Sequence, residues 1–413
     1  MPAFSMNSVL ALSSARRFGR AVPRIAVVAM ALAGCARGGT AQASVRTDTA
    51  ITEEDLRTRV HIFADDSMQG RAAGSRGHER ALAYLAGELT RLGLKPAGDG
   101  NSFYQRVPIP QGRDTLWSSN VVAVLEGIDP ALRGQYVALG AHSDHVGTAD
   151  RPVDHELTRA INRADWERRG RVAGAAELSA IERATVEDSV RDAWKVRRGG
   201  PLRMDAIFNG ADDDGSGSMA LLEIAEHFVA AEARPKRSML FVWHTGEEIG
   251  LNGSDWFVRH PTVPLDRIVA QINVDMIGRG SARDIEGGGD DYLSVLGAGR
   301  QSSQLATWVE SVNQQRPRPL VLDYSLDVDG HPENLFCRSD HANYASRGIP
   351  IVFLFTNIHE DYHEVTDEPA YLDYPHYARV TSYIAALARK VGDHATPPAV
   401  DRPRPDPVAP CRQ

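Results

Sequence analysis

The sequence predicts an α/β protein with a mixed, mainly parallel central sheet and helices on both faces of that sheet. Short apolar runs typical of buried strands alternate with longer amphipathic runs typical of helices. Chemically active side chains follow directly after several of the apolar runs, where the ligand crevice of such a sheet lies. The composition is that of a globular protein, with 42% hydrophobic and 24% charged residues among 413.

The positions of the expected elements follow from this alternation. We expect strands at 120–125, 136–141, 238–243, 269–274 and 351–355, and helices at 78–92, 216–230, 302–313 and 376–391. A charged segment at about 148–208 interrupts the pattern and has helical composition at 157–171 and 176–196. Long loops without structure are uncommon in compact domains, so we expect this insertion to form a helical flap that limits substrate size. The alternative is a solvated decoration remote from the substrate.

The two ends of the chain differ from its central part. Residues 1–34 combine arginines, a short apolar run and small residues, which is typical of a secretory signal peptide. Cys35 follows Leu-Ala-Gly, a sequence similar to the lipidation site of bacterial lipoproteins. We therefore expect a lipidated Cys35, a linker at 35–50, one main domain at 51–395 and a Pro-rich disordered tail at 396–413. This organisation predicts an exported lipoprotein, periplasmic or anchored at the outer membrane.

Charge and cysteine content limit the possible partners. Residues 1–34 hold four arginines and no acid, so their removal changes the net charge from −8 to −12. An acidic surface disfavours nucleic acid as a partner. No segment after Cys35 reaches the 18 or so apolar residues of a membrane span, so we expect membrane contact through the lipid alone. An oxidising compartment would permit a disulfide between Cys337 and Cys411, but the sequence does not show that they lie close together.

The most informative segment is 241–250, an apolar run that ends in two adjacent glutamates between glycines. Neighbouring side chains of extended backbone point to opposite sides, so Glu248 can bind a metal ion while Glu247 faces the substrate. A metal-activated water needs a proton acceptor that is not itself a ligand, and we assign that role to Glu247.

Two further segments contain candidate ligands. His142 follows the run 136–141, and Asp144, two residues later, is expected to orient its imidazole ring. The acids 212–214 stand between glycines at the start of a predicted helix, where they could simply compensate the helix dipole. The middle one, Asp213, is the candidate to bridge two cations, because a tight turn lets the backbone approach such a site.

The last two candidates follow later strands. Asp275 comes directly after the run 269–274, and His363 lies in the segment that follows the run 351–355. His359 and His363 are four residues apart, but their segment lacks helical periodicity. We therefore take His363 as the ligand and His359 as an accessory or surface residue.

These motifs, in this order, resemble the co-catalytic zinc aminopeptidase family, whose relatives include bacterial leucyl aminopeptidases, glutamate carboxypeptidases and glutaminyl cyclases. The resemblance runs from about residue 70 to about residue 386 and includes the segments 70–75, 92–96 and 339–341. It implies a zinc-peptidase fold of the phosphorylase/hydrolase-like type and two zinc ions per chain. One ion would take His142 and Asp275, the other Glu248 and His363, and Asp213 would bridge them.

The resemblance also leaves points open. Some members of the family hold the oxyanion with a tyrosine just before the Ser-Asp-His segment, where this chain has Phe336. The second metal ion, Arg338 or another residue such as Tyr344 would then stabilise that charge.

A catalytic role for Cys337 is not needed when a metal ion activates water. The expected activity is an exopeptidase that removes amino-terminal residues from peptides. The alternatives are a glutamate-carboxypeptidase-like hydrolase of acidic peptides, a glutaminyl cyclase and an inactive surface binding protein.

Overall fold

The computed structural model describes residues 47–172, 174–197 and 202–402. In this part of the chain, nine strands form one sheet with the order β1-β3-β7-β4-β8-β11-β9-β10, and β2 pairs with β3. Four central strands are parallel to one another: β7 (Ser238–His244), β4 (Tyr136–His142), β8 (Ile268–Val274) and β11 (Ile351–Phe355). Antiparallel strands extend the sheet on both sides, which confirms the predicted mixed fold.

The outer strands complete the sheet. On one side lie β1 (Lys95–Pro96), β2 (Tyr104–Gln111) and β3 (Asp114–Leu125); on the other lie β9 (Tyr292–Leu296) and β10 (Val321–Asp323). Strand β3 starts six residues before the predicted range, because its first half pairs with β2 in a hairpin.

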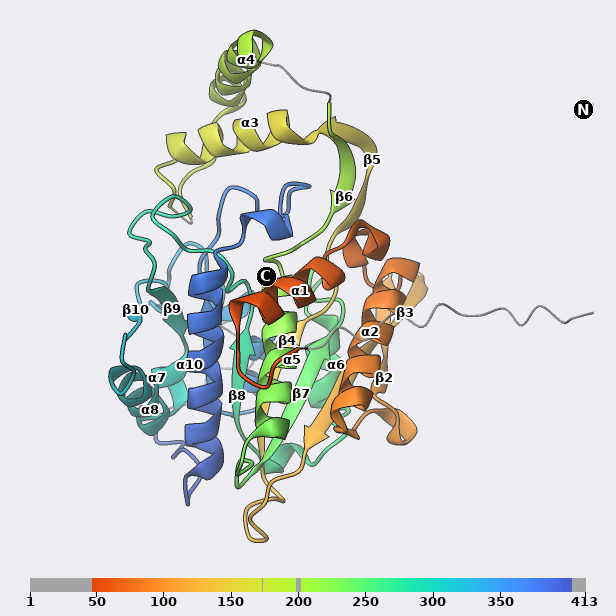
Figure 1. Cartoon of the computed structure of the whole chain (residues 1–413), viewed down its shortest axis with the longest axis vertical. Helices are drawn as coiled ribbons and strands as arrows, with labels where there is room; N and C mark the ends of the chain where they lie inside the picture. Colours follow the sequence, from red (N-terminus) through yellow and green to blue (C-terminus); the bar gives the residue numbers. More distant parts are fainter. Residues whose placement is uncertain (1–46, 173, 198–201, 403–413) are drawn as a thin grey trace, which may run out of the picture. The chain divides into compact units, whose positions relative to one another are not determined.

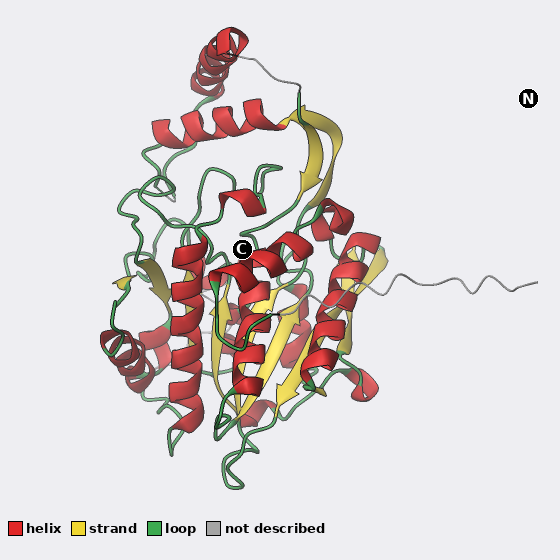
Figure 2. Ribbon diagram, in the orientation of Figure 1, coloured by secondary structure: helices red, strands yellow, loops and turns green. Residues whose placement is uncertain are grey.

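Helices cover both faces of the sheet, as the alternation of buried side chains requires. In β7, Met239, Phe241 and Trp243 belong to the larger hydrophobic cluster, whereas Leu240 and Val242 belong to the second one. The larger cluster is formed with α1 (Glu53–Phe63), α2 (Arg76–Leu92), α5 (Gly215–Ala230), α8 (Ser303–Gln314) and α10 (Tyr374–Asp393). Helices α6 (Asn252–Arg259) and α9 (His341–Ser346) cover the other face. Figure 2 shows the strands of the sheet with helices packed along them.

The insertion between β4 and α5 contains a ribbon and two helices (Figure 1). Strand β5 (Gly147–Asp154) leads to α3 (His155–Arg168), and α4 (Ala180–Arg197) precedes β6 (Met204–Phe208), which pairs antiparallel with β5. Both helices lie within three to four residues of their predicted positions, whereas the ribbon was not predicted. The ribbon starts five residues after His142 and ends five residues before Asp213, so the insertion leaves and rejoins the main domain next to two proposed ligands.

Contacts from α3 bind the insertion to loops of the main domain. The indole Nε1 of Trp166 donates a hydrogen bond to the backbone carbonyl of Asp284, and Arg163 forms an ion pair with Glu360. Arg159 lies 3.4 Å from the carboxylate of Asp361. The insertion is therefore attached to the same loop that carries His363.

The ends of the chain are described only in part. The predicted signal peptide and Cys35 lie outside the described residues, as do residues 403–413. The first part of the predicted tail lies against α8, where the backbone N–H of Ala399 donates to Gln304 and Asp401 accepts a hydrogen bond from Ser303. Among the described residues, no helix is both long and apolar enough to cross a membrane.

Candidate metal centre

The predicted site residues follow the carboxyl ends of the four central strands. His142 is the last residue of β4, Glu247 and Glu248 follow β7, and Asp275 follows β8. His363 lies in the loop after β11. Parallel strands end at the same edge of a sheet, so their loops meet over one crevice. Asp213 reaches the same place from the turn before α5 and is joined to Asp214 by a cis peptide bond.

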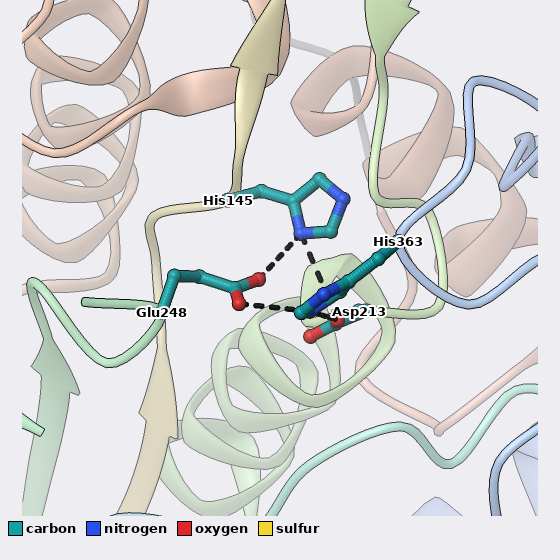
Figure 3. A group of neighbouring side chains, drawn as sticks. All are labelled: His145, Asp213, Glu248 and His363. Atoms are coloured by element: carbon teal, nitrogen blue, oxygen red, sulfur yellow. Dashed lines mark hydrogen bonds and ion pairs between the residues drawn. The ribbon is translucent and has the colours of Figure 1, made fainter. Parts of the chain in front are cut away.

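One group of ligand atoms comes from Asp213, Glu248 and His363, together with His145. These four atoms lie within 4.8 Å of one another. His363 Nε2 is 2.8 Å from Glu248 Oε2 and 3.1 Å from Asp213 Oδ2, and His145 Nδ1 is 2.7 Å from Glu248 Oε1. Figure 3 shows the side chains turned toward a common point.

A second group shares Asp213 with the first. His142 Nε2 lies 3.1 Å from Asp213 Oδ1 and 3.6 Å from Asp275 Oδ1. Asp213 thus turns one carboxylate oxygen to each group, which is the arrangement of a ligand that bridges two cations. Ser339 donates a hydrogen bond of 2.7 Å to the other oxygen of Asp275 and so fixes its orientation.

The donor set fits bound zinc ions. Two ligands of a tetrahedral zinc ion, each about 2.0–2.1 Å from the metal, lie roughly 3.4 Å apart, close to the separations above. Asp213 Oδ2 and His363 Nε2 are buried and make no hydrogen bond although they face each other. Burial lowers the pKa of His363, but its carboxylate partners outweigh this and raise that pKa to about 10. A cation between these groups would take the place of the proton.

Asp144 and Glu247 lie next to the two ligand groups. We expected the Asp144 carboxylate to orient His142, but the acceptor 3.1 Å from His142 Nδ1 is the backbone carbonyl of Asp144. The carboxylate instead accepts a hydrogen bond of 3.3 Å from the backbone N–H of Glu247. Burial, together with the charges of Glu248 and Asp275, raises the pKa of Glu247 well above its ordinary value, despite the opposing effect of His142.

A cavity lies against both ligand groups and has polar and apolar residues in its wall. The polar residues are His142, Asp213, Glu247, Glu248, Asp275, Arg338 and Ser339, and the others are Met276, Leu335, Phe353, Phe355, Ile358 and Tyr362. Glu247 therefore faces the same space as the ligands without belonging to either group. A side chain in this position can exchange a proton with a molecule in the cavity.

The neighbours of Asp213 are structural. Asp214 caps α5 through the Gly217 N–H and also accepts hydrogen bonds from the backbone N–H groups of His142 and Met276. Asp212 lies 3.1 Å from His359 Nε2, so His359 supports the turn and belongs to neither ligand group. Asp214 therefore lies at the start of α5 as the dipole interpretation expects, whereas the Asp212 carboxylate instead contacts His359 and the backbone N–H of Gly278.

The candidates for oxyanion stabilisation separate clearly in the structure. Tyr344 is fully buried, with its hydroxyl 3.0 Å from His244 Nε2, and it is not part of the cavity wall. Phe336 packs in the second hydrophobic cluster. Arg338 lines the cavity, as does Tyr362, which stacks on His363 at 3.9 Å between ring centroids. Cys337 is disulfide-bonded, so it offers no free thiol.

Sequence reasoning missed two residues of this centre. His145 was not proposed as a ligand, although it stands in the same turn as His142. Arg71 was noted only as part of the segment 70–75, yet its guanidinium is completely buried and donates to the backbone carbonyls of Phe63, Ser143, Asn209 and Gly210. Nothing in the sequence marks an arginine as a donor to carbonyls, because its acceptors are distant and carry no side-chain signature.

Comparison with known proteins agrees with this geometry. The chain matches the family described as Peptidase family M28 over residues 120–388. It is 28% identical over 156 residues to leupeptin-inactivating enzyme 1 of Streptomyces exfoliatus, covering 37% of this chain and 31% of that protein. It is 35% identical over 176 residues to an aminopeptidase of Pseudomonas aeruginosa, covering 39% and 30%. The matches thus span about a third of these relatives.

Solved structures share the fold at low sequence identity. The LapA aminopeptidase of Legionella pneumophila superimposes with a TM-score of 0.54 at 18% identity, over 84% of this chain and 72% of that one. The glutaminyl cyclase of Porphyromonas gingivalis has a TM-score of 0.54 at 17% identity, over 81% and 97%.

Proposed function

Because this chain belongs to peptidase family M28, we propose that it is a zinc-dependent aminopeptidase that hydrolyses the amino-terminal peptide bond of its substrates. The observation that carries the proposal is the shared carboxylate of Asp213, which turns one oxygen to His142 and the other to His363. Two cations held by one bridging carboxylate suit hydrolysis of an amide bond. Relatives named aminopeptidases support the choice of reaction.

The chain's own residues divide the chemistry between them. When bound, the zinc ions would polarise the scissile carbonyl group and lower the pKa of water. Glu247 would accept the proton of the attacking water and pass it to the leaving amine. Neighbouring positive charge would lower this raised pKa, so Glu247 would be ionised and able to take up a proton once cations are present. Arg338 and Tyr362, both in the cavity wall, are placed to meet negative charge that develops on the carbonyl oxygen.

The cavity wall favours an apolar amino-terminal residue. Its apolar residues are large side chains from β11 and the loops around it, and several of them belong to one buried cluster. A free amino group would pair with the carboxylates of the same wall. We therefore propose that leucine, methionine and phenylalanine are preferred over charged residues.

The insertion extends this cavity away from the sheet. A second cavity of about 400 Å³ shares Arg338, Ile358 and Tyr362 with the first and is lined by residues of α3 and α4. A peptide that leaves the metal centre would run under these helices. This supports the interpretation of the insertion as a flap that limits the size of the substrate.

A substrate panel with metal analysis tests the proposed activity. We expect zinc-loaded protein to hydrolyse leucyl amides and free-amino peptides, to leave blocked peptides and acidic dipeptides intact, and to lose activity with chelator. Cyclisation of amino-terminal glutamine would favour the glutaminyl cyclase alternative. Cleavage of carboxyl-terminal glutamate would favour the carboxypeptidase alternative, and no turnover at all would favour the binding protein.

Matched glutamate variants test the division of roles. Glu247→Gln should lower kcat by about 10²- to 10⁴-fold, the usual contribution of a general base, with zinc content unchanged. Glu248→Gln, one residue away, should lose zinc. Loss of zinc from the Glu247→Gln variant would overturn our assignment of the two side chains.

We further propose that the protein is exported and anchored through lipid on Cys35. The sequence pattern of residues 16–35 supports this proposal. Mass spectrometry of the mature amino terminus tests it: a diacylated cysteine at position 35 is expected, and an intact terminus contradicts it.

A further inference from the structure

A third group of metal-type ligands lies at the far end of the β5–β6 ribbon, outside the centre described above. It consists of His155, the first residue of α3, with Asp205 from β6 and Glu368 from the loop that follows His363. One ligand atom of each lies within 4.8 Å of the others, and all three residues are buried. None of these three residues belongs to the two ligand groups that share Asp213.

Nε2 of the His155 imidazole has no hydrogen-bond partner and lies in the group. The residue has no exposed surface, and its Nε2 makes no hydrogen bond, with the nearest oxygen of Glu368 3.6 Å away. On the other side of the ring, Nδ1 lies 3.2 Å from the Glu156 carboxylate. A carboxylate there holds the proton on Nδ1, so Nε2 presents a lone pair to Asp205 and Glu368.

Lone pairs that face one another in a buried space repel one another, and a positive charge between them would remove this repulsion. Asp205 and Glu368 carry two negative charges when ionised, and Arg203 returns one through its contacts with both carboxylates. Glu156 is half exposed and lies on the other side of the ring, so one negative charge remains uncompensated within the buried group. Arg203 is half exposed and contacts Glu368 Oε1, the same oxygen that lies 3.6 Å from the buried His155 Nε2.

We propose that His155, Asp205 and Glu368 bind a third zinc ion, separate from the catalytic pair. One imidazole and two carboxylates are ordinary zinc ligands, and ligand separations near 3.6 Å suit tetrahedral coordination with one position left for water. The ring of Tyr371 stacks on His155 at 6.2 Å between centroids and shields this side of the site.

A cation at this site would link the insertion to the loop that carries His363. Asp205 and His155 belong to the insertion, whereas Glu368 follows Asp367, whose carboxylate accepts hydrogen bonds from the backbone N–H groups of Asp212 and Asp213. A cation at this point therefore joins the flap to the turn that presents the bridging carboxylate.

Zinc content of full-length protein tests the proposal through a difference between variants. After zinc loading and removal of loosely bound metal, Asp205→Asn should contain one zinc ion per chain fewer than wild type. Asp154→Asn is the matched control, because Asp154 caps α3 beside His155 but does not belong to the group. It should match wild type. Equal zinc content in wild type and Asp205→Asn would overturn the proposal, whatever the catalytic centre holds.

Anomalous diffraction from wild-type crystals gives a test that needs no variant. A zinc peak among His155, Asp205 and Glu368 is expected at the zinc absorption edge. A map without density there would show that Arg203 alone neutralises the two carboxylates, and the third site would then be wrong.

Discussion

Replacement of Arg279 by leucine should show how strongly one buried guanidinium holds the loop that carries His363. Arg279 has 2% of its side chain exposed and contacts three acids. Its Nε and Nη2 donate to Asp284 Oδ1 at 3.1 and 2.7 Å, and Nη1 donates to Asp361 at 3.0 Å. Glu360 lies 3.5 Å away. The variant therefore leaves three buried carboxylates short of a partner.

The expected cost follows from burial. Removing one partner of a buried ion pair costs about 3–5 kcal/mol, because the remaining charge stays desolvated. This cost changes the unfolding equilibrium by roughly 10²- to 10⁴-fold. Arg159, Arg163 and the Thr366 hydroxyl still contact Glu360 or Asp361, so we expect the lower half of this range.

Arg318 provides a matched control for this measurement. Its Nε and Nη2 donate to one oxygen of Asp291 at 2.9 and 2.7 Å, the same fork that Arg279 forms with Asp284, but its side chain is 54% exposed. Arg318→Leu should cost at most about 1 kcal/mol. Urea unfolding of both variants in the presence of chelator separates stability from metal binding. Equal losses for the two variants would refute the argument from burial.

Three further predictions concern pH, the insertion and the backbone. Burial raises the pKa of Asp284, but the charge and hydrogen bonds of Arg279 outweigh this effect and hold the pKa well below its usual value of 3.8. The ion pair therefore stabilises the fold at pH values above 3.8. The stability deficit of Arg279→Leu should therefore shrink as pH falls below about 3.8 in acid titrations of both proteins, and a constant deficit would contradict this sign. Trp166→Ala removes the indole bond to the Asp284 carbonyl and should raise kcat/KM for long peptides relative to short ones; an unchanged ratio would count against the flap. Gly70→Ala should destabilise the protein by more than about 2 kcal/mol, because φ is +64° and a Cβ would lie 1.9 Å from the Gly147 carbonyl oxygen. Gly87→Ala, in open space on α2, should be neutral or stabilising in the same thermal unfolding assay.

The sequence predicted the elements that are marked by apolar runs. Strand β11 has its predicted ends because it is a continuous apolar run, and α5 starts within one residue of its predicted start. The five proposed ligands also lie together, because four of them lie at the end of a central strand or in the loop after it, and Asp213 lies in the turn before α5.

Features that depend on distant partners were not predictable. The β5–β6 ribbon has exposed, charged strands, so no apolar alternation marks it. His155 lies close to Asp205 and Glu368 only because the ribbon folds back against the loop that contains Glu368. The contact of the Asp144 carbonyl, in place of its carboxylate, with His142 depends on backbone direction in the turn, which residue identity does not specify.

The buried guanidinium of Arg71 implies that the catalytic half of the molecule depends on an earlier stretch of sequence. The family match begins at residue 120, and every proposed ligand lies beyond that point. Yet the carbonyls of Ser143, Asn209 and Gly210, which flank two of the ligand turns, all converge on one side chain contributed fifty residues before the match. A shortened chain that started at residue 120 would retain every proposed metal ligand. It would lack Arg71, whose hydrogen bonds hold the turn after His142 and the turn before Asp213 together. Activity should therefore be restored to such a chain only when the segment containing Arg71 is supplied.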